Sequence, residues 1–320
     1  MRGIFLSLSA VITFGIQAQT YPPQAGEAGS TAVHKDDPSF VAWATGITVT
    51  RGYKDISNPS IGHVTGGEPE YALGPPTGEV VSLGDNGFAV LTFNLPIKNG
   101  PGFDFAVFEN GSAGYLELAT VEISSDGIHY FKFSTHSLTQ TLTQINSFGT
   151  PLAEHLDNIA GKYIGTYGTP FDISKAPNHP LLDKNNIKYV KVIDVVGSID
   201  PQYGTPDNFG NMINDSFPTP FDAGGFDLQA VGVIHQASAA VNDVDKEPVI
   251  VYPNPFEDYL YVQNESGISF EITVYDIYGK LRIHQKKVSF EINTSVLPPG
   301  VYVLELKNAS EKIIRKMIKK

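Results

Sequence analysis

The chain has 320 residues, of which 41% are hydrophobic and 18% are charged, and its sequence contains no cysteine. This composition excludes a wholly disordered chain and a collagen-like one. Without cysteine, a disulfide scaffold, a thiolate zinc site and a cysteine nucleophile are also excluded. The formal net charge of −12 argues against nucleic acid as a partner, because phosphates demand a basic surface.

The charge is divided unevenly along the chain. Residues 1–248 carry a net charge of −14, whereas residues 249–320 carry a net charge of +2. A change of this kind indicates two modules with different roles, and the length agrees with about two domains.

The first 19 residues have the pattern of a secretory signal peptide. Arg2 gives a basic start, an apolar stretch runs from Ile4 to Ile16, and the small Ala18 suits a signal peptidase. The stretch is shorter than the roughly 20 apolar residues that a membrane-spanning helix needs. We therefore expect an exported protein whose mature chain has no transmembrane segment.

The next 216 residues predict a lead-in and a β-rich main domain. Residues 20–38 are polar and rich in Pro and Gly, which predicts a lead-in strand or tail. Residues 39–235 alternate short apolar runs with turn-forming residues, and only 151–161 is compatible with a short helix. The pattern predicts an all-β domain closed as a jelly-roll β-sandwich. The predicted strands are 88–95, 103–109, 116–123, 128–133, 187–196 and 226–234.

A linker and a second β module complete the chain. Residues 236–248 are small, polar and acidic, and they predict a linker. In 249–320, the turn signals Tyr278-Gly279-Lys280 and Pro298-Pro299-Gly300 separate alternating apolar runs. The predicted strands are 249–252, 259–263, 269–276, 280–286, 288–293, 300–307 and 311–318.

Four features of this second module occur in a specific order. They are Tyr252-Pro253-Asn254-Pro255-Phe256, then Val274-Tyr275-Asp276 with Gly279-Lys280, then Pro299-Gly300-Val301-Tyr302, and a basic end from Lys312 to Lys320. Together they resemble the type A C-terminal sorting domain of cargo proteins of the Bacteroidetes type IX secretion system. The resemblance implies a small Ig-like β-sandwich and the type IX secretion machinery as a partner. It also implies passage through the periplasm and across the outer membrane, removal of the domain, and a secreted or cell-surface location.

The main domain has two weaker resemblances. The stretches VEISSDGIHYFKF at 121–133 and IKYVKVID at 187–194 resemble galactose-binding-like jelly rolls of the discoidin type. Over 30–235, the stretches GPGFDFAVFEN at 100–110 and GGFDLQAVG at 224–232 resemble a family of uncharacterised secreted bacterial cell surface proteins. The second resemblance implies no reaction.

Phe-Asp pairs suggest a calcium site. The pair occurs four times, at 103–104, 171–172, 221–222 and 226–227. A buried carboxylate needs a partner, and calcium takes six to eight oxygen ligands without Cys or His. The alternative is that these side chains cap turns by accepting backbone N–H bonds. The candidate metal ligands are Asp104, Glu109, Asn110, Asp222 and Asp227.

Strand alternation separates two of these candidates. Phe105, Val107 and Glu109 share one face of the predicted strand, and Asp104 lies on the other. Both faces are partly apolar, which predicts a central strand. We therefore treat Asp104 and Glu109 as members of separate sites.

Aromatic residues in Gly- and Pro-rich stretches and in long loops suggest a ligand surface. Long loops in a compact domain often carry function, and aromatic rings suit sugars or other flat ligands. The alternative is that these residues pack the core and the loops. The candidate ligand-binding residues are Trp43, Arg51, Tyr53, Tyr167 and Tyr203.

These features favour an exported, cell-surface binding module for a glycan or other extracellular ligand, with calcium as a supporting cofactor. One alternative is a polysaccharide hydrolase that uses a pair drawn from Glu109, Glu117 and Glu122. Others are capture of a scarce nutrient such as cobalamin, and a structural surface protein. The sequence has no HExxH motif, nucleophile elbow or phosphate loop, so no catalytic residue is assigned.

Overall fold

The computed structural model describes residues 20–237, 249–264, 269–288, 290–308 and 312–320. The predicted signal peptide and most of the predicted linker lie outside the described residues. The chain divides between 239 and 240 into two compact units, here called unit 1 and unit 2.

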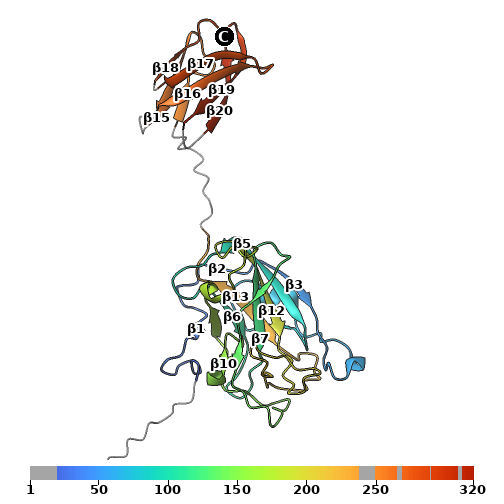
Figure 1. The fold of residues 1–320 in the computed structure, drawn as a ribbon. Coiled ribbons are helices and arrows are strands. Elements are labelled where there is room, and N and C mark those ends of the chain that lie inside the picture. The colour runs from blue at the N-terminus through green and yellow to red at the C-terminus, as the bar shows by residue number, and fades with distance from the viewer. Residues whose placement is uncertain (1–19, 238–248, 265–268, 289, 309–311) are drawn as a thin grey trace, which may run out of the picture. The chain divides into compact units, whose positions relative to one another are not determined.

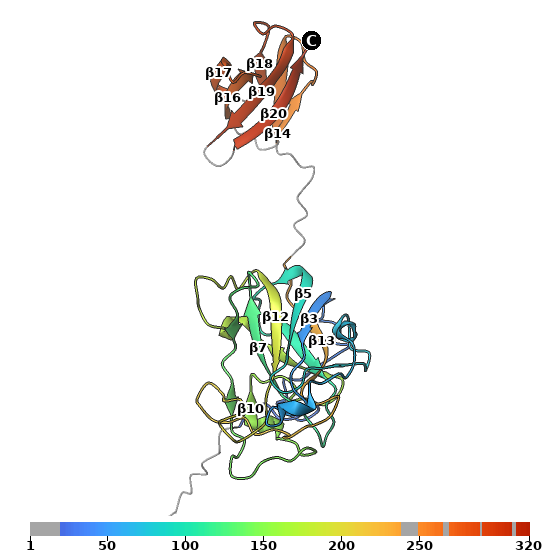
Figure 2. The ribbon, with the colours of Figure 1, turned by 90° about the vertical axis from the view of Figure 1, so that its right-hand side faces the viewer.

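Unit 1 consists of two antiparallel sheets and a short strand pair (Figures 1 and 2). The first sheet has the order β1 (Val33–His34), β11 (Tyr167–Phe171), β6 (Phe105–Glu109), β13 (Asp227–Val233) and β2 (Ala42–Trp43), and β4 (Val81–Ser82) also pairs with β13. The second has the order β3 (Gly46–Thr50), β5 (Phe88–Ile97), β12 (Ile187–Asp194), β7 (Ala119–Ser124) and β8 (Phe131–Lys132). The separate pair is β9 (His136–Ser137) with β10 (Leu156–Asp157).

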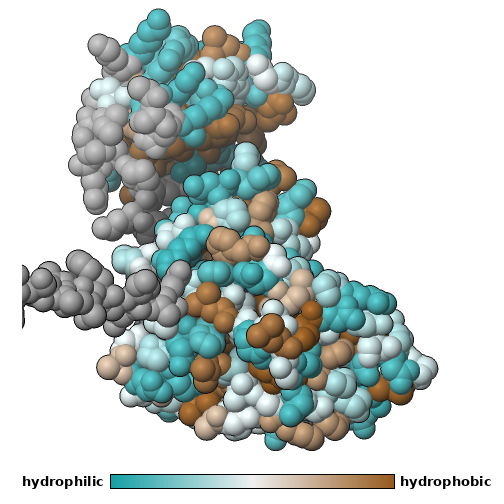
Figure 3. Space-filling model, turned by 60° about the horizontal axis from the view of Figure 1, so that its bottom comes forward, coloured by the Kyte–Doolittle hydropathy of each residue, from teal (hydrophilic) through white to brown (hydrophobic). Residues whose placement is uncertain are grey.

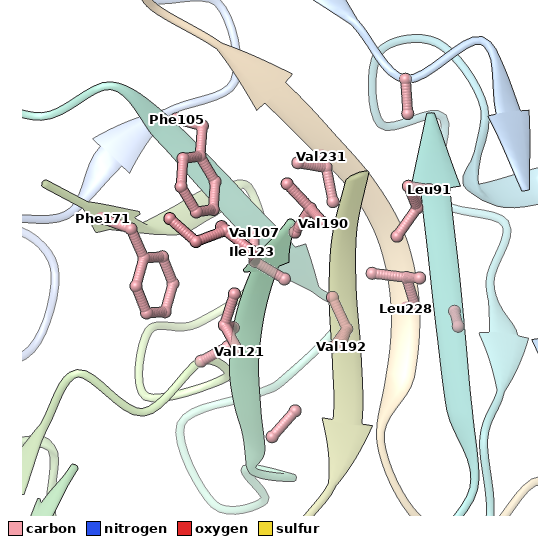
Figure 4. Packing of buried hydrophobic residues seen from close by; sticks show 14 of the residues in the cluster. Leu91, Phe105, Val107, Val121, Ile123, Phe171, Val190, Val192, Leu228 and Val231 are labelled. Atoms are coloured by element: carbon pink, nitrogen blue, oxygen red, sulfur yellow. The ribbon is translucent and has the colours of Figure 1, made fainter. Parts of the chain in front are cut away.

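The core of unit 1 lies between these two sheets. Every second side chain of a strand points to the same face, so an apolar face of each sheet can be buried against the other. Phe105 and Val107 of β6 pack in one cluster with Val121 of β7 and Val190 and Val192 of β12 (Figure 4). All five β6 residues are buried because the strand lies between β11 and β13, which confirms the predicted central strand.

The predicted all-β class is confirmed, and two local predictions need correction. The described helices are single 3₁₀ turns: η1 (Pro59–Ile61), η2 (Pro69–Ala72), η3 (Ala153–His155) and η4 (Ile173–Lys175). The short helix considered for 151–161 is therefore only η3 followed by β10. Strand β11 is not among the predicted strands, because Pro170 interrupts the run of strand-forming residues. The narrower galactose-binding-like assignment stays a prediction.

Unit 2 is a smaller all-β structure with two antiparallel sheets. One is β14 (Val249–Tyr252), β15 (Tyr259–Asn264) and β18 (Glu291–Asn293). The other is β17 (Leu281–Val288), β16 (Phe270–Asp276), β19 (Gly300–Lys307) and β20 (Lys312–Lys319). Phe256, Leu260, Ile272 and Leu304 belong to its buried core.

Two of the sequence features that resemble a sorting domain have clear structural roles in unit 2. Asp276 Oδ1 accepts the backbone N–H groups of Tyr278 and Lys280 at 2.9 and 3.0 Å, which holds the Asp-x-x-Gly-Lys turn. Asn254 of the Tyr-Pro-Asn-Pro segment accepts the N–H of Ile318 at 2.9 Å and donates to the carbonyl of Lys316. The opening motif is thereby bonded to the last, basic strand. In the part of the chain described, no helix is long and apolar enough to cross a membrane.

Candidate functional site

The two sheets of unit 1 are tied together at one end. Strand β12 ends at Asp194 and β13 begins at Asp227, and the N–H of Phe226 donates to Asp194 Oδ1 at 2.7 Å. Strand β6 ends at Glu109 beside Leu228 of β13. Because neighbouring strands are antiparallel, the connections 110–118 and 195–226 leave the sheets at this same end. Figures 1 and 2 show long loops extending below the strands of this unit.

A groove opens between the 195–226 connection and residues 136–141. It encloses about 620 Å³, and the residues on one side come from β9 and the turn after it, while those on the other come from the 195–226 connection. Phe209 stands beside it and is 68% exposed, and the centroid of its ring lies 4.4 Å from that of His136. Tyr21 packs edge-on against His136 and is hydrogen-bonded to its Nδ1. The lining residues are His136, Ser137, Leu138, Thr139, Thr141, Ile199, Pro201, Gly210, Asn211 and Met212.

Asp207 holds the loop that presents Phe209. Its Oδ1 accepts the N–H groups of Phe209 and Asn211 at 2.8 and 2.9 Å, and its Oδ2 accepts the N–H of Ser137 at 2.8 Å. Burial acts to raise the pKa of Asp207, but these bonds outweigh it and lower the pKa below its usual value. The aromatic ring is therefore carried on a loop that is fixed to β9. Figure 3, with the loop end of unit 1 turned toward the viewer, shows hydrophobic patches among hydrophilic residues.

Four buried carboxylates lie at the same end of the sandwich. We call Glu109, Glu117, Asp215 and Asp227 the carboxylate cluster; their residues are 1%, 4%, 3% and 8% exposed. Burial raises the pKa of Asp215 to about 7 and that of Asp227 to about 6. The pKa values of Glu109 and Glu117 are raised well above the usual value. The larger cause is burial, and the second is the negative charge of Asp227.

Asp85 and Asp194 are a second buried pair, and each has a structural role. Asp194 accepts the N–H groups of Phe226 and Asn86, and Asp85 accepts the N–H of Ile56 at 2.8 Å. Burial raises the pKa of Asp85 to about 7. Their oxygens thus serve the backbone of the turns around them.

The structure brings together three of the five predicted metal ligands. Glu109, Asn110 and Asp227 are neighbours, with Asn110 Nδ2 3.5 Å from Asp227 Oδ2. Asp104 lies at the other end of β6, where its carboxylate accepts the N–H of Ile173 at 2.7 Å. Asp222 is exposed and forms an ion pair with Lys54. Among the described residues, no group of three or more His, Cys, Asp or Glu side chains has the arrangement of a metal site.

Three of the predicted ligand-binding residues pack against or hydrogen-bond to neighbouring parts of unit 1. Trp43 packs against Phe40 and Phe108 on the outer face of the first sheet, with ring centroids 4.9 and 5.6 Å away. The Arg51 guanidinium donates to the carbonyls of Gly66, Gly67 and Ser82. Tyr53 stacks on His63 at 4.5 Å.

The other two lie elsewhere. Tyr167 packs edge-on against His34 at 5.0 Å. Tyr203 is half-buried in the 195–226 connection, which also supplies Ile199 and Pro201 to the groove. The five residues do not converge on one surface. The groove was missed because its two sides are about 70 residues apart, and no local pattern indicates that they pair.

Comparison with known proteins identifies the C-terminal segment. Residues 250–320 match the family model described as the secretion system C-terminal sorting domain. This confirms the predicted type IX sorting domain, which interacts with the type IX secretion machinery. The chain is accordingly secreted by this system to the cell surface or the extracellular space.

The remaining comparisons add no function. No protein with a curated description matches the chain. Similar solved structures include a beta-glucuronidase from Faecalibacterium prausnitzii, at 12% identity and a TM-score of 0.23, covering 87% of this chain and 44% of that one. Another is PorZ of Porphyromonas gingivalis, a surface component of the type IX secretion system, at 12% identity and a TM-score of 0.20, covering 97% and 47%. The chain spans less than half the length of either structure, and TM-scores this low do not show a shared fold.

Proposed function

We propose that unit 1 is a binding module that takes an extracellular glycan in the groove beside Phe209, and that unit 2 delivers it to the cell exterior. The observation that carries this proposal is the exposed Phe209 ring, held next to a polar groove by the hydrogen bonds of Asp207. An aromatic ring beside a groove with polar groups is a typical element of a ligand site. Its flat apolar face matches the C–H face of a pyranose ring.

The composition of the groove supports a sugar over a purely apolar ligand. Ligand sites combine apolar and aromatic walls with a few polar groups that fix orientation. Here Leu138 and Ile199 accompany the hydroxyl groups of Thr139 and Thr141 and the amide of Asn211. A pyranose offers both an apolar face and hydroxyl groups, so it can use both kinds of wall.

The groove favours binding over hydrolysis. A glycosidase needs two carboxyl groups that flank the bond it cleaves. The described residues that line the groove include neither Asp nor Glu. Of the candidates for such a pair, Glu109 and Glu117 are almost fully buried, and Glu122 forms an ion pair with Lys191.

A glycan array probed with the full chain tests the proposal. Bound glycans are then titrated by calorimetry into the wild type, Phe209→Ala and Phe148→Ala. Phe148 is a matched control because it is similarly exposed, at 74% against 68%, but packs against Phe221 and not against the groove residue His136. Loss of one aromatic platform is expected to weaken binding at least tenfold, which corresponds to about 1.4 kcal/mol. Phe148→Ala should leave affinity unchanged.

Two results would reject the proposal. One is an array on which no glycan is retained, and the other is a glycan whose affinity is the same for the wild type and Phe209→Ala. A parallel titration with cobalamin tests the nutrient-capture alternative on the same samples. Asp207→Ala should also weaken binding, because it removes the bond that holds Phe209 together with the bonds to Ser137 and Asn211 of the groove wall.

A further inference from the structure

The four carboxyl groups of the carboxylate cluster have no cationic side chain in direct contact among the described residues. Burying a carboxylate costs several kcal/mol unless a partner compensates its charge. The ion pairs of the described residues include none to Glu109, Glu117, Asp215 or Asp227. Arg51 acts on Asp227 at longer range, but the bonds of its guanidinium go to backbone carbonyls.

Hydrogen bonds satisfy only part of the cluster. Asp215 accepts the N–H groups of Leu118 and Ser216 at 3.0 and 2.8 Å, so its oxygens are used by the backbone. Glu117 Oε1 accepts the hydroxyl of Tyr115 at 3.0 Å. Asp227 accepts the hydroxyl of Ser82 at 2.5 Å.

Glu109 is the member of the carboxylate cluster whose hydrogen bonding indicates a missing ligand. Its Oε2 accepts the N–H of Gly111 at 2.7 Å, but its Oε1 is fully buried and has no hydrogen-bond partner in the described structure. An unsatisfied buried acceptor is costly, and native structures rarely keep one without a reason. A bound cation would satisfy this oxygen and neutralise its neighbours at the same time.

We propose that Glu109, Glu117 and Asp227, with the amide oxygen of Asn110, bind a calcium ion at the loop end of unit 1. The ligands are all oxygens, which suits a hard cation, whereas zinc favours nitrogen and sulfur. Calcium accepts irregular coordination by six to eight oxygens, and magnesium demands a near-ideal octahedron. Since the side chains do not have a metal-site arrangement as they stand, binding includes rotation of the Glu117 and Asp227 side chains toward Glu109 Oε1.

The site is connected to the groove through one segment of the chain. Asp215 lies three residues after Met212, which lines the groove, and it accepts the N–H of Leu118, the residue after the proposed ligand Glu117, at 3.0 Å. Between Met212 and Asp215, Ile213 packs in a buried cluster with Leu118. Calcium is therefore expected to stabilise the loops that form the groove. The cation proposal does not depend on what the groove binds.

The test is a thermal melt of the full chain from which metal ions have been removed by a chelator. Unfolding is monitored by tryptophan fluorescence at neutral to mildly alkaline pH. Trp43 is the single Trp of the sequence and belongs to unit 1, so the signal reports that unit. A hundredfold excess of calcium over its dissociation constant is expected to raise the melting temperature by about 5–10 °C. Magnesium should give a smaller rise.

Glutamine variants locate the site. Glu109→Gln keeps the shape of the side chain and should abolish the calcium-dependent rise. Glu122→Gln is the matched control, because Glu122 is a partly exposed residue of the same unit that pairs with Lys191, and it should keep the full rise. No rise at millimolar calcium, or the same rise in Glu109→Gln and the wild type, would overturn the proposal.

Terbium binding to the wild type tests the site even if Glu109→Gln does not fold. Terbium substitutes for calcium, and its emission would be sensitised by Tyr115, whose hydroxyl contacts Glu117. We expect emission from the wild type that added calcium displaces and that Tyr115→Phe reduces. Emission that calcium does not displace, or that Tyr115→Phe leaves unchanged, would contradict a site at this position.

Discussion

Asp104 offers the most direct test of how unit 1 is held together. Its carboxylate is fully buried at the start of β6, where it accepts the N–H groups of Gly100 and Ile173, both at 2.7 Å. The ring of His235 contributes a third contact at 2.8 Å. One side chain thus ties together three segments that are far apart in the sequence. We predict that Asp104→Ala destabilises unit 1 strongly, whether or not calcium is present.

The magnitude follows from the groups left behind. Asp104→Ala leaves two buried backbone donors without an acceptor, and each such donor costs about 1–3 kcal/mol. Because water can reach the partly exposed His235, we expect a loss of about 3–5 kcal/mol in the free energy of unfolding. This is a large fraction of the roughly 5–15 kcal/mol that stabilises a typical domain.

Urea unfolding of the full chain, followed by Trp43 fluorescence, measures the effect. The expected loss corresponds to a fall of about 1–2 M in the urea midpoint. Asp222→Ala is the control, because Asp222 is an exposed carboxylate with one surface ion pair, and it should cost less than about 1 kcal/mol. A folded Asp104→Ala variant that loses less than about 1 kcal/mol would refute the reasoning, since the donors would then have other partners.

Two further predictions concern the loop end. First, burial raises the pKa of Asp215 to about 7 and that of Asp227 to about 6, so the folded metal-free chain binds more protons than the unfolded chain between about pH 4 and pH 7. Its stability should therefore fall as the pH rises through this window, by about 3–4 kcal/mol for Asp215 alone, and Asp215→Asn should flatten the profile. Melts in chelator at pH 5 and pH 8 check this, and a higher melting temperature at pH 8 would contradict it. Second, Gly161 has φ of +85°, and a Cβ there would lie 1.8 Å from the carbonyl oxygen of Glu117. Gly161→Ala should cost at least about 3 kcal/mol in urea unfolding. Gly78→Ala, also at positive φ but in open space, should cost only about 1 kcal/mol, and equal effects would exclude the clash as the cause.

Much of the fold was predictable because strand signals are local. Alternating and continuous apolar runs mark β5 at 88–97, β12 at 187–194 and β13 at 227–233 within a few residues. The sorting motifs were equally readable, since the turn at Asp276 and the Asn254 segment depend on residues close in sequence or on a fixed motif order. Strand β11 was not predicted, because Pro170 hides it and its pairing with β6 is long-range.

The candidate site was predictable only in part, for a related reason. The Phe-Asp pattern correctly marked Asp227 as a buried carboxylate, but it also marked Asp222, which is exposed. Nothing in the local pattern linked Glu117 to Asp215, whose contact with Leu118 spans 97 residues. Aromatic composition drew attention to Trp43, which packs on the outer face of a sheet.

The sequence by itself determined the β-rich class of both units and the type IX sorting signal, because period-two runs, turn residues and an ordered motif act over short stretches of chain. Only the tertiary structure decided which loops meet. The antiparallel pairing of β6 with β13 and of β12 with β7 brings four buried carboxylates to one end of the sandwich. The bonds of Asp207 hold Phe209 beside a groove there. Strand register and loop closure depend on contacts between residues far apart in sequence, which no local pattern encodes.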